Sequence, residues 1–159
     1  MAMKVLVVLG DGGHSAEMLK LIKLLGSKYE YSYMMAMTDS ISKGKILWAG
    51  PIYRVPIPFG KHTANRNPLR ALGPILRQLI VLLRVRPKAI LSSGANIAVP
   101  ISAFGRLMGV KVIHIETGSR VFTMSSTGKL MYRVAHLFFV QWEPLQKAYP
   151  KAIYAGRLL

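Results

Sequence analysis

The sequence predicts an α/β fold in which a Rossmann-like parallel sheet carries helices on both faces. Its first apolar run, residues 5–9, is rich in β-branched side chains and is followed at once by Gly10, Gly12, Gly13 and a helical pattern. Strand-like and helix-like stretches then alternate along the rest of the 159 residues, which is typical of parallel strands joined by helical crossovers. We expect residues 1–159 to form a single domain, because this length suffices for one core.

The other elements follow from the same two periodicities. Apolar residues on one helix face predict a helix over residues 15–25, which ends at Gly26. Short apolar runs predict strands over residues 31–37, 52–57, 89–92, 110–115 and 137–140, with a last strand near Ile153. Helices are expected from Pro68 or Pro74 to Val85, over residues 100–108 and from Glu143, and Asp39 and Ser40 are expected to cap a short helix.

Composition limits the classes of partner. The 22 Lys and Arg against 6 Asp and Glu give a net charge of +16, which indicates a polyanionic partner such as nucleic acid, an anionic membrane or a phosphate-bearing substrate. No apolar run approaches the roughly 20 residues of a membrane span. The absence of cysteine excludes disulfides and is compatible with the cytosol. The start MAMK leads directly into the first strand, so we expect no signal peptide.

The predicted helix that ends at Val85 has a row of basic residues. The row consists of Arg70, Arg77 and Arg84, and we expect Val81 and Val85 to lie beside it, opposite the leucines. Such a face fits a helix that lies on an anionic membrane, and it fits equally a core helix with a solvated basic back. Nucleic acid is not expected as a partner, since the basic region from Arg66 to Lys88 lacks aromatic residues for stacking.

Three predicted strand ends meet at one edge of a parallel sheet, and we expect the chemistry there. Residues 10–14 supply glycine-turn amides at a helix N-terminus, which suit an anion, and His14, which exchanges a proton near neutral pH. Residues 116–120 begin with Glu116, whose burial would be costly unless it is paired or hydrogen-bonded. An ordinary tight turn with an exposed histidine, and a simple salt bridge at Glu116, are the alternatives.

The candidate catalytic residues are therefore His14 and Glu116. The candidate ligand-binding residues at the same edge are Gly12, Gly13, Ser15, Ser93, Gly94, Asn96 and Arg120. We expect no metal and no cofactor, because His62, His114 and His136 lack ligand spacing with one another. His114 lies within an apolar strand and is expected to be a core residue.

Four segments, in order, carry a resemblance to a known family: GDGGHSAEM, HIETGSRVFTMSSTGKLMY, FFVQWEPL and YPKAIYAG. They resemble the membrane-associated subunit of the two-part UDP-N-acetylglucosamine transferase of lipid-linked oligosaccharide synthesis. They are equally similar to PssD-type proteins of bacterial polysaccharide synthesis. More remotely, GDGGH and HIET resemble stretches in the acceptor half of the peptidoglycan transferase MurG.

The resemblance implies the N-terminal half of a GT-B glycosyltransferase. Such a chain would bind a polyprenyl-diphosphate-linked sugar acceptor at the cytoplasmic face of the membrane, as a peripheral protein. A separate partner subunit would bind the nucleotide sugar, and the pair would transfer N-acetylglucosamine with inversion. In that scheme His14 is the base, with Glu116 as the alternative base. A non-catalytic adaptor that recruits its partner to the membrane is the alternative function.

The sequence departs from the family at two points. Eukaryotic members usually have Ser where this chain has Asp11, and a carboxylate there is unfavourable beside a diphosphate unless it turns away. They also carry an N-terminal membrane helix, which we do not expect here. Membrane attachment would then depend on the basic amphipathic surface or on the partner.

Overall fold

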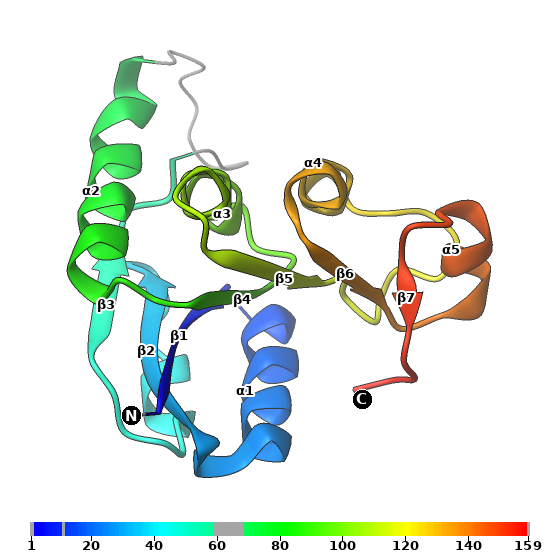
Figure 1. Ribbon diagram of the computed structural model, residues 1–159, viewed down its shortest axis with the longest axis horizontal. Helices are drawn as coiled ribbons and strands as arrows, with labels where there is room; N and C mark the ends of the chain where they lie inside the picture. Colours follow the sequence, from blue (N-terminus) through cyan, green and yellow to red (C-terminus); the bar gives the residue numbers. More distant parts are fainter. Residues whose placement is uncertain (1, 11, 59–68, 159) are drawn as a thin grey trace.

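The computed structural model describes residues 2–10, 12–58 and 69–158, and it contains one sheet of seven parallel strands (Figure 1). Asp11, His62 and most of the expected loop at residues 58–68 lie outside the described residues. The strands are β1 (Met3–Leu9), β2 (Tyr29–Ala36), β3 (Ile52–Val55), β4 (Ala89–Ser93), β5 (Lys111–Ile115), β6 (Leu137–Val140) and β7 (Ile153–Tyr154). The helices are α1 (Gly13–Leu25), α2 (Leu69–Val85), α3 (Ala98–Leu107), α4 (Ser126–Val134) and α5 (Glu143–Ala148), with 3-10 turns at Gly26–Lys28 and Ser42–Lys45.

The strand order is β3-β2-β1-β4-β5-β6-β7, so the chain grows outward from β1 in one direction and then in the other. The order reverses between β1 and β4, which pair in register from Val5 with Ala89 to Val8 with Ser92. Every strand pair among the described residues is parallel. This confirms the predicted Rossmann-like sheet, whose ligand edge is the one at which the strands end.

The sheet separates two apolar cores. Leu6 and Val8 of β1 point toward α2, α3 and α4, whereas Val5, Val7 and Leu9 point toward α1. Both sets are buried because a parallel strand with helices on both faces has no solvent side. Figure 1 shows the three helices α2, α3 and α4 on one face and α1 on the other.

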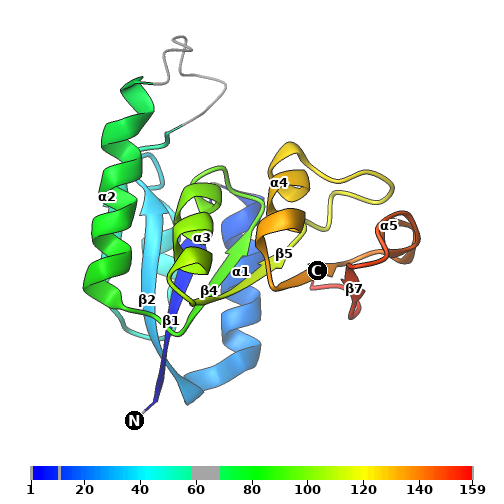
Figure 2. The same cartoon turned by 45° about the horizontal axis from the view of Figure 1, so that its top comes forward.

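The structure corrects the predicted orientation of α2. Val81 and Val85 are not exposed beside the arginines but buried in the core on this face of the sheet, and Ala71, Gln78 and Leu82 of the same helix are buried as well. The exposed large apolar residues of α2 are Leu69, Leu72, Leu76, Ile80 and Leu83. Figure 2 shows α2 at the outside of the molecule, beside α3. The sequence of α2 has apolar stripes on two sides, so its periodicity alone did not decide which stripe is inside.

The predicted element boundaries need smaller corrections. The predicted strand over residues 52–57 ends at Val55, and α2 begins at Leu69 and includes Pro74. The N-cap of the turn at Ser42–Lys45 is Ile41, and not Asp39 or Ser40 as expected, although Asp39 Oδ1 accepts from the backbone N–H groups of Ile41 and Ser42. The sequence analysis did not predict α4, although Ser125 is an N-cap whose hydroxyl accepts from the Gly128 N–H.

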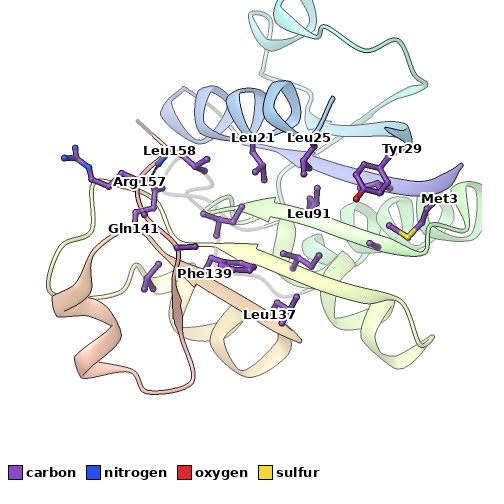
Figure 3. A pocket seen from close by; sticks show the side chains of 17 residues that line it. Met3, Leu21, Leu25, Tyr29, Leu91, Leu137, Phe139, Gln141, Arg157 and Leu158 are labelled. Atoms are coloured by element: carbon purple, nitrogen blue, oxygen red, sulfur yellow. Dashed lines mark hydrogen bonds between the residues drawn. The ribbon is translucent and has the colours of Figure 1, made fainter. Parts of the chain in front are cut away.

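The face that carries α1 is covered over only part of its width. Among the described residues, α1 packs beside β1 and β4, and an apolar groove of about 380 Å³ runs along the strands next to it. Leu21 of α1, Ile113 and Phe139 line the groove, and residues 155–158 close one end (Figure 3). No described helix is long and apolar enough to cross a membrane.

Candidate active site

The carboxyl ends of β1, β4 and β5 lie side by side, because these strands are neighbours in the sheet and run in the same direction. The glycine turn after β1, the Gly94 turn after β4 and the Glu116 loop after β5 therefore meet at one edge, as predicted. His14 and Glu116 both belong to this edge. The functional roles assigned to the residues here remain predictions.

His14 lies half-buried in the first turn of α1, and its ring covers Gly94. Gly94 has a φ of 59°, and a Cβ at that position would overlap the imidazole, so the site requires glycine there. Nδ1 of His14 is buried without a hydrogen-bond partner among the described residues. No hydrogen bond among the described residues therefore fixes this ring nitrogen.

The N-terminus of α1 is open to solvent. Gly12 and Gly13 are exposed, no side chain caps the helix and its first turn contains no acidic residue. Backbone N–H groups without intrahelical partners and the positive end of the helix dipole thus face the edge beside His14. This is a favourable position for an anionic group.

Ser15 and Ser93, which the sequence predicts as ligand-binding, point into the protein. The Ser15 hydroxyl is hydrogen-bonded to the Gly10 carbonyl and contacts Asp39 Oδ2 at 3.3 Å, and it is buried. Ser93 donates to Glu17 Oε2 at 2.9 Å. Both hydroxyls hold the edge together, and their side chains are not offered to a ligand.

Asn96 and Arg120 are exposed at the edge. Asn96 accepts from the Thr127 hydroxyl at 2.6 Å, which ties the loop after β4 to α4. Arg120 belongs to the loop after β5 and lies close enough to Glu116 to influence its ionisation. Of the predicted binding residues, Gly12, Gly13, Asn96 and Arg120 are therefore exposed, Gly94 is half-buried, and Ser15 and Ser93 are buried.

Glu116 is fully buried, and both oxygens of its carboxylate accept hydrogen bonds from within the protein. Oε2 and Oε1 accept from Ser125 N and Oγ at 3.0 to 3.2 Å, and Oε1 also accepts from Thr117 N at 3.1 Å. Burial raises the pKa of this carboxyl above its ordinary value, while the Ser125 and Thr117 hydrogen bonds and Arg120 act in the opposite direction. The carboxylate thus joins the end of β5 to the N-cap of α4.

Glu17, which is not among the residues predicted from the sequence, is a second buried carboxylate at the edge. It accepts from Gly118 N at 2.7 Å, Ser93 Oγ at 2.9 Å, Thr117 Oγ1 at 3.2 Å and Gln141 Nε2 at 3.4 Å. These donors come from the ends of three strands, and Glu17 follows His14 by one helical turn. An acidic residue on the buried side of an otherwise apolar helix face was the available signal in the sequence.

His114 is buried in β5, as expected, with Nδ1 at 2.9 Å from Ser92 Oγ. Burial lowers its pKa to about 3, and the nearby His14 contributes in the same direction. It is therefore neutral at physiological pH. The described residues contain no group of three or more His, Cys, Asp or Glu that could hold a metal ion.

Comparison with known proteins gives a consistent result. The family model described as "Oligosaccharide biosynthesis protein Alg14 like" matches residues 5–56 and 61–158. The UDP-N-acetylglucosamine transferase subunit ALG14 of Homo sapiens is 29% identical over 181 residues, which cover 99% of this chain and 84% of the relative. The corresponding subunit of Schizosaccharomyces pombe is 31% identical over 170 residues, with coverage of 95% and 81%.

Solved structures of lower sequence identity share the fold. MurG of Acinetobacter baumannii superimposes with a TM-score of 0.77 at 19% identity, over 96% of this chain and 45% of MurG. A UDP-N-acetylglucosamine 2-epimerase of Neisseria meningitidis, bound to UDP-GlcNAc, gives 0.69 at 19% identity over 98% of this chain and 46% of the epimerase. The chain thus spans slightly less than half the length of these two proteins.

Proposed function

The chain belongs to the family of Alg14-like oligosaccharide biosynthesis proteins, and on this premise we propose that it is the acceptor-binding subunit of a two-part inverting glycosyltransferase. A separate subunit binds the nucleotide sugar, and the pair transfers N-acetylglucosamine from UDP to a sugar on a polyprenyl diphosphate. The observation that carries the proposal is the half-buried His14 beside the uncapped N-terminus of α1. The relatives are named as subunits of a UDP-N-acetylglucosamine transferase, which supports the proposal.

In the proposed reaction His14 acts as the general base. It takes the proton from the acceptor hydroxyl while that oxygen forms a bond to the anomeric carbon of the donor sugar. The bond from the anomeric carbon to the UDP oxygen breaks, and UDP leaves with the electron pair. A positioned base typically contributes a factor of about 10² to 10⁴ in rate. The neighbouring His114 is neutral and adds no competing positive charge.

The acceptor diphosphate is proposed to lie against the N-terminus of α1. The exposed backbone at Gly12 and Gly13 supplies N–H donors, and Arg120 supplies a positive charge from the loop after β5. Asn96 can contact the sugar from the loop after β4. Glu116, the alternative base, is enclosed by Ser125, so we assign it the support of this loop.

The experiment is to reconstitute the pair and replace His14 by Gln. We expect kcat to fall by a factor of about 10² or more while the acceptor KM changes little, because the base acts mainly in the transition state. His136→Gln is the matched control, since His136 precedes β6 and lies at the opposite edge of the sheet. Full activity of the His14 variant would contradict the proposed role.

A non-catalytic adaptor is the second candidate function. It is favoured by one observation: the Glu116 carboxylate is closed off, which leaves His14 as the one candidate base in the described part of the site. In an adaptor, replacing His14 would leave kcat unchanged, whereas disrupting the membrane surface would lower activity only when the acceptor is in vesicles. The same kinetic experiment therefore separates the two functions.

The outer side of α2 is proposed to hold the protein at the cytoplasmic face of the membrane. Leu72, Leu76, Ile80 and Leu83 are exposed there, and Arg70, Arg77 and Arg84 lie exposed along the same helix. Apolar side chains flanked by cations suit the interface of an anionic bilayer. The proposal keeps the predicted arginines and replaces the buried valines by these exposed aliphatic residues.

The test is sedimentation with vesicles that contain phosphatidylserine. The double substitution Arg77→Glu and Arg84→Glu should weaken binding strongly. Lys20→Glu with Lys23→Glu makes the same change in net charge on exposed positions of α1, across the sheet, and should weaken binding much less. Equal loss in both variants would mean that overall charge, and not α2, determines attachment.

The apolar groove beside α1 is proposed to receive a helix of the partner subunit. An open apolar face of a sheet is unfavourable in water. In addition, the chain covers slightly less than half of each of the two solved structures named above. A helix placed on the uncovered strands would complete the second face of the sheet.

A further inference from the structure

Gln141 joins the candidate active site to the C-terminal segment of the chain. It follows β6 directly and is buried at one end of the apolar groove (Figure 3). Its Nε2 group donates to Glu17 Oε1 at 3.4 Å and to the Glu116 carbonyl at 3.1 Å. Its Oε1 accepts from Leu158 N at 2.8 Å. One side-chain amide thus contacts both the candidate active site, at Glu17 and Glu116, and the C-terminal segment, at Leu158.

A second contact holds the same segment. The Arg157 guanidinium lies 4.3 Å from the centre of the Trp142 ring, and Trp142 Nε1 donates to the Gly118 carbonyl at 2.7 Å. Gly118 N in turn donates to Glu17. The C-terminal segment is therefore linked to the Glu17 network through two neighbouring side chains.

The orientation of the Gln141 amide depends on both sides at once. A carboxylate accepts but does not donate, so the amide must turn its NH₂ group toward Glu17 and its oxygen away. The Leu158 N–H stabilises that orientation because it donates to the Gln141 oxygen. If the segment moved away, the amide would lose this bond and could rotate, which would leave Glu17 with one donor fewer.

We propose that Gln141 is a positioning residue that couples the state of the groove and the C-terminal segment to the geometry of the candidate active site. The proposal rests on the proposed function, in which the partner subunit occupies the groove. Binding of the partner fixes residues 155–158, these fix the Gln141 amide, and the amide completes the bonds of Glu17. Glu17 then holds α1, and with it His14, against the loops after β4 and β5.

Gln141→Glu tests the coupling, because it keeps the oxygen that faces Leu158 and removes the donor that faces Glu17. At saturating partner we expect kcat to fall about tenfold near neutral pH, the equivalent of one lost hydrogen bond to a charged group. The dissociation constant for the partner should change less than twofold. Gln146→Glu, the same change on α5, is the matched control and should leave kcat unchanged.

The pH dependence separates positioning from a loss of structure. In Gln141→Glu the new carboxyl faces Glu17, with the Glu116 carbonyl and the Leu158 N–H as its other neighbours and the Arg157 charge stacked nearby on Trp142. Two adjacent carboxyls share a proton at acidic pH, and the protonated one can donate as glutamine does. The kcat of the variant relative to the unchanged pair should therefore recover as pH falls. Gln141→Met, with no donor, should show no recovery.

A measurement without turnover keeps the proposal independent of the enzymatic assignment. Titration with the partner should shift the NMR signals of the His14 ring and the Gly118 amide in the unchanged chain, and much less in Gln141→Met. If Gln141→Glu and Gln141→Met have normal kcat and normal NMR shifts, or lose activity only through weaker partner binding or a lower Tm, the coupling is wrong. If the unchanged pair transfers no sugar but the shifts depend on Gln141, the proposed function fails and the coupling stands.

Discussion

At the scale of single residues, the site depends on a glycine that has no functional group of its own. Gly94 leaves room for the His14 ring, and its positive φ is one that other residues adopt at a cost. Its position could be predicted from sequence, because the apolar strand before it ends there. The sequence marks Glu17 only as an acidic residue on a buried helix face. Gln141 could not be predicted, since its hydrogen bond to Glu17 joins residues 124 positions apart and nothing local marks it.

Gly94→Ala should lower both stability and activity. Alanine at this φ costs about 1 kcal/mol, and the added methyl group displaces the imidazole, so kcat should fall about tenfold or more. Gly109→Ala is the control, because Gly109 has a φ of 77° with nothing near its missing Cβ. It should lose similar stability in urea denaturation and keep its activity. Equal activities would show that the ring does not depend on Gly94.

Glu116 should leave a signature in the pH dependence of stability. Its folded-state pKa is raised above the ordinary 4.5, so the folded protein keeps a proton that the unfolded chain has released. Stability from this group is therefore full below about 4.5 and is lost as pH rises through the raised value. In urea denaturation, the stability of the natural chain minus that of Glu116→Gln should be larger at pH 4.5 than at pH 7. A difference that grows with pH would contradict the raised pKa.

At the scale of elements, α2 shows where periodicity stops being informative. Its apolar residues on two sides predict a helix correctly but leave its rotation open, and packing against the sheet buries Val81 and Val85. The strands are simpler, because a parallel strand buried on both faces is apolar throughout and has no rotation to decide. The sequence therefore predicted the sheet better than the outer surface of this helix.

Val81→Ala and Leu76→Ala should have opposite consequences. Val81 is 7% exposed, so its truncation leaves a cavity and should cost about 2 kcal/mol of unfolding free energy. Leu76 is 57% exposed, so its truncation should change stability by less than about 0.5 kcal/mol and instead weaken vesicle binding. A reversed order of stabilities would restore the orientation expected from the sequence.

Gln78 on the inner side of α2 should be replaceable with a gain in stability. Its amide is fully buried, and neither Nε2 nor Oε1 has a hydrogen-bond partner among the described residues. Gln78→Met keeps the length of the side chain and removes the desolvation cost, so unfolding free energy should rise by about 1 kcal/mol. Gln146→Met, on the partly exposed α5, should produce little change. A loss of stability in Gln78→Met would mean that the amide is hydrated.

At the scale of the whole molecule, the sheet separates three surfaces. The carboxyl edge carries the candidate site, α2 lies on one face, and the groove opens on the other. The fold and the edge could be predicted from strand–helix alternation, since parallel strands bring their ends together wherever they lie in the chain. The groove could not, because it depends on which strands α1 leaves uncovered among the described residues.

Ile113→Lys should weaken assembly with the partner subunit more than it destabilises the fold. Ile113 is half-buried on the floor of the groove, so a lysine there places a charge where we propose that the partner helix packs. We expect the dissociation constant for the partner to rise at least about tenfold. Leu107→Lys, at an 85% exposed position at the end of α3, is the control and should bind normally in isothermal titration. Equal affinities would place the partner elsewhere.

The order of the strands also has a consequence during synthesis of the protein. β1 is synthesised before β4, one of its two neighbours in the sheet, which begins only at Ala89. Until then the buried and apolar residues of β1 have an unpaired edge, which is a template for association with other nascent chains. Pairing of both edges of β1 is thus tied to synthesis of the chain through β4, and chaperones that shield short apolar strands should matter most before that point.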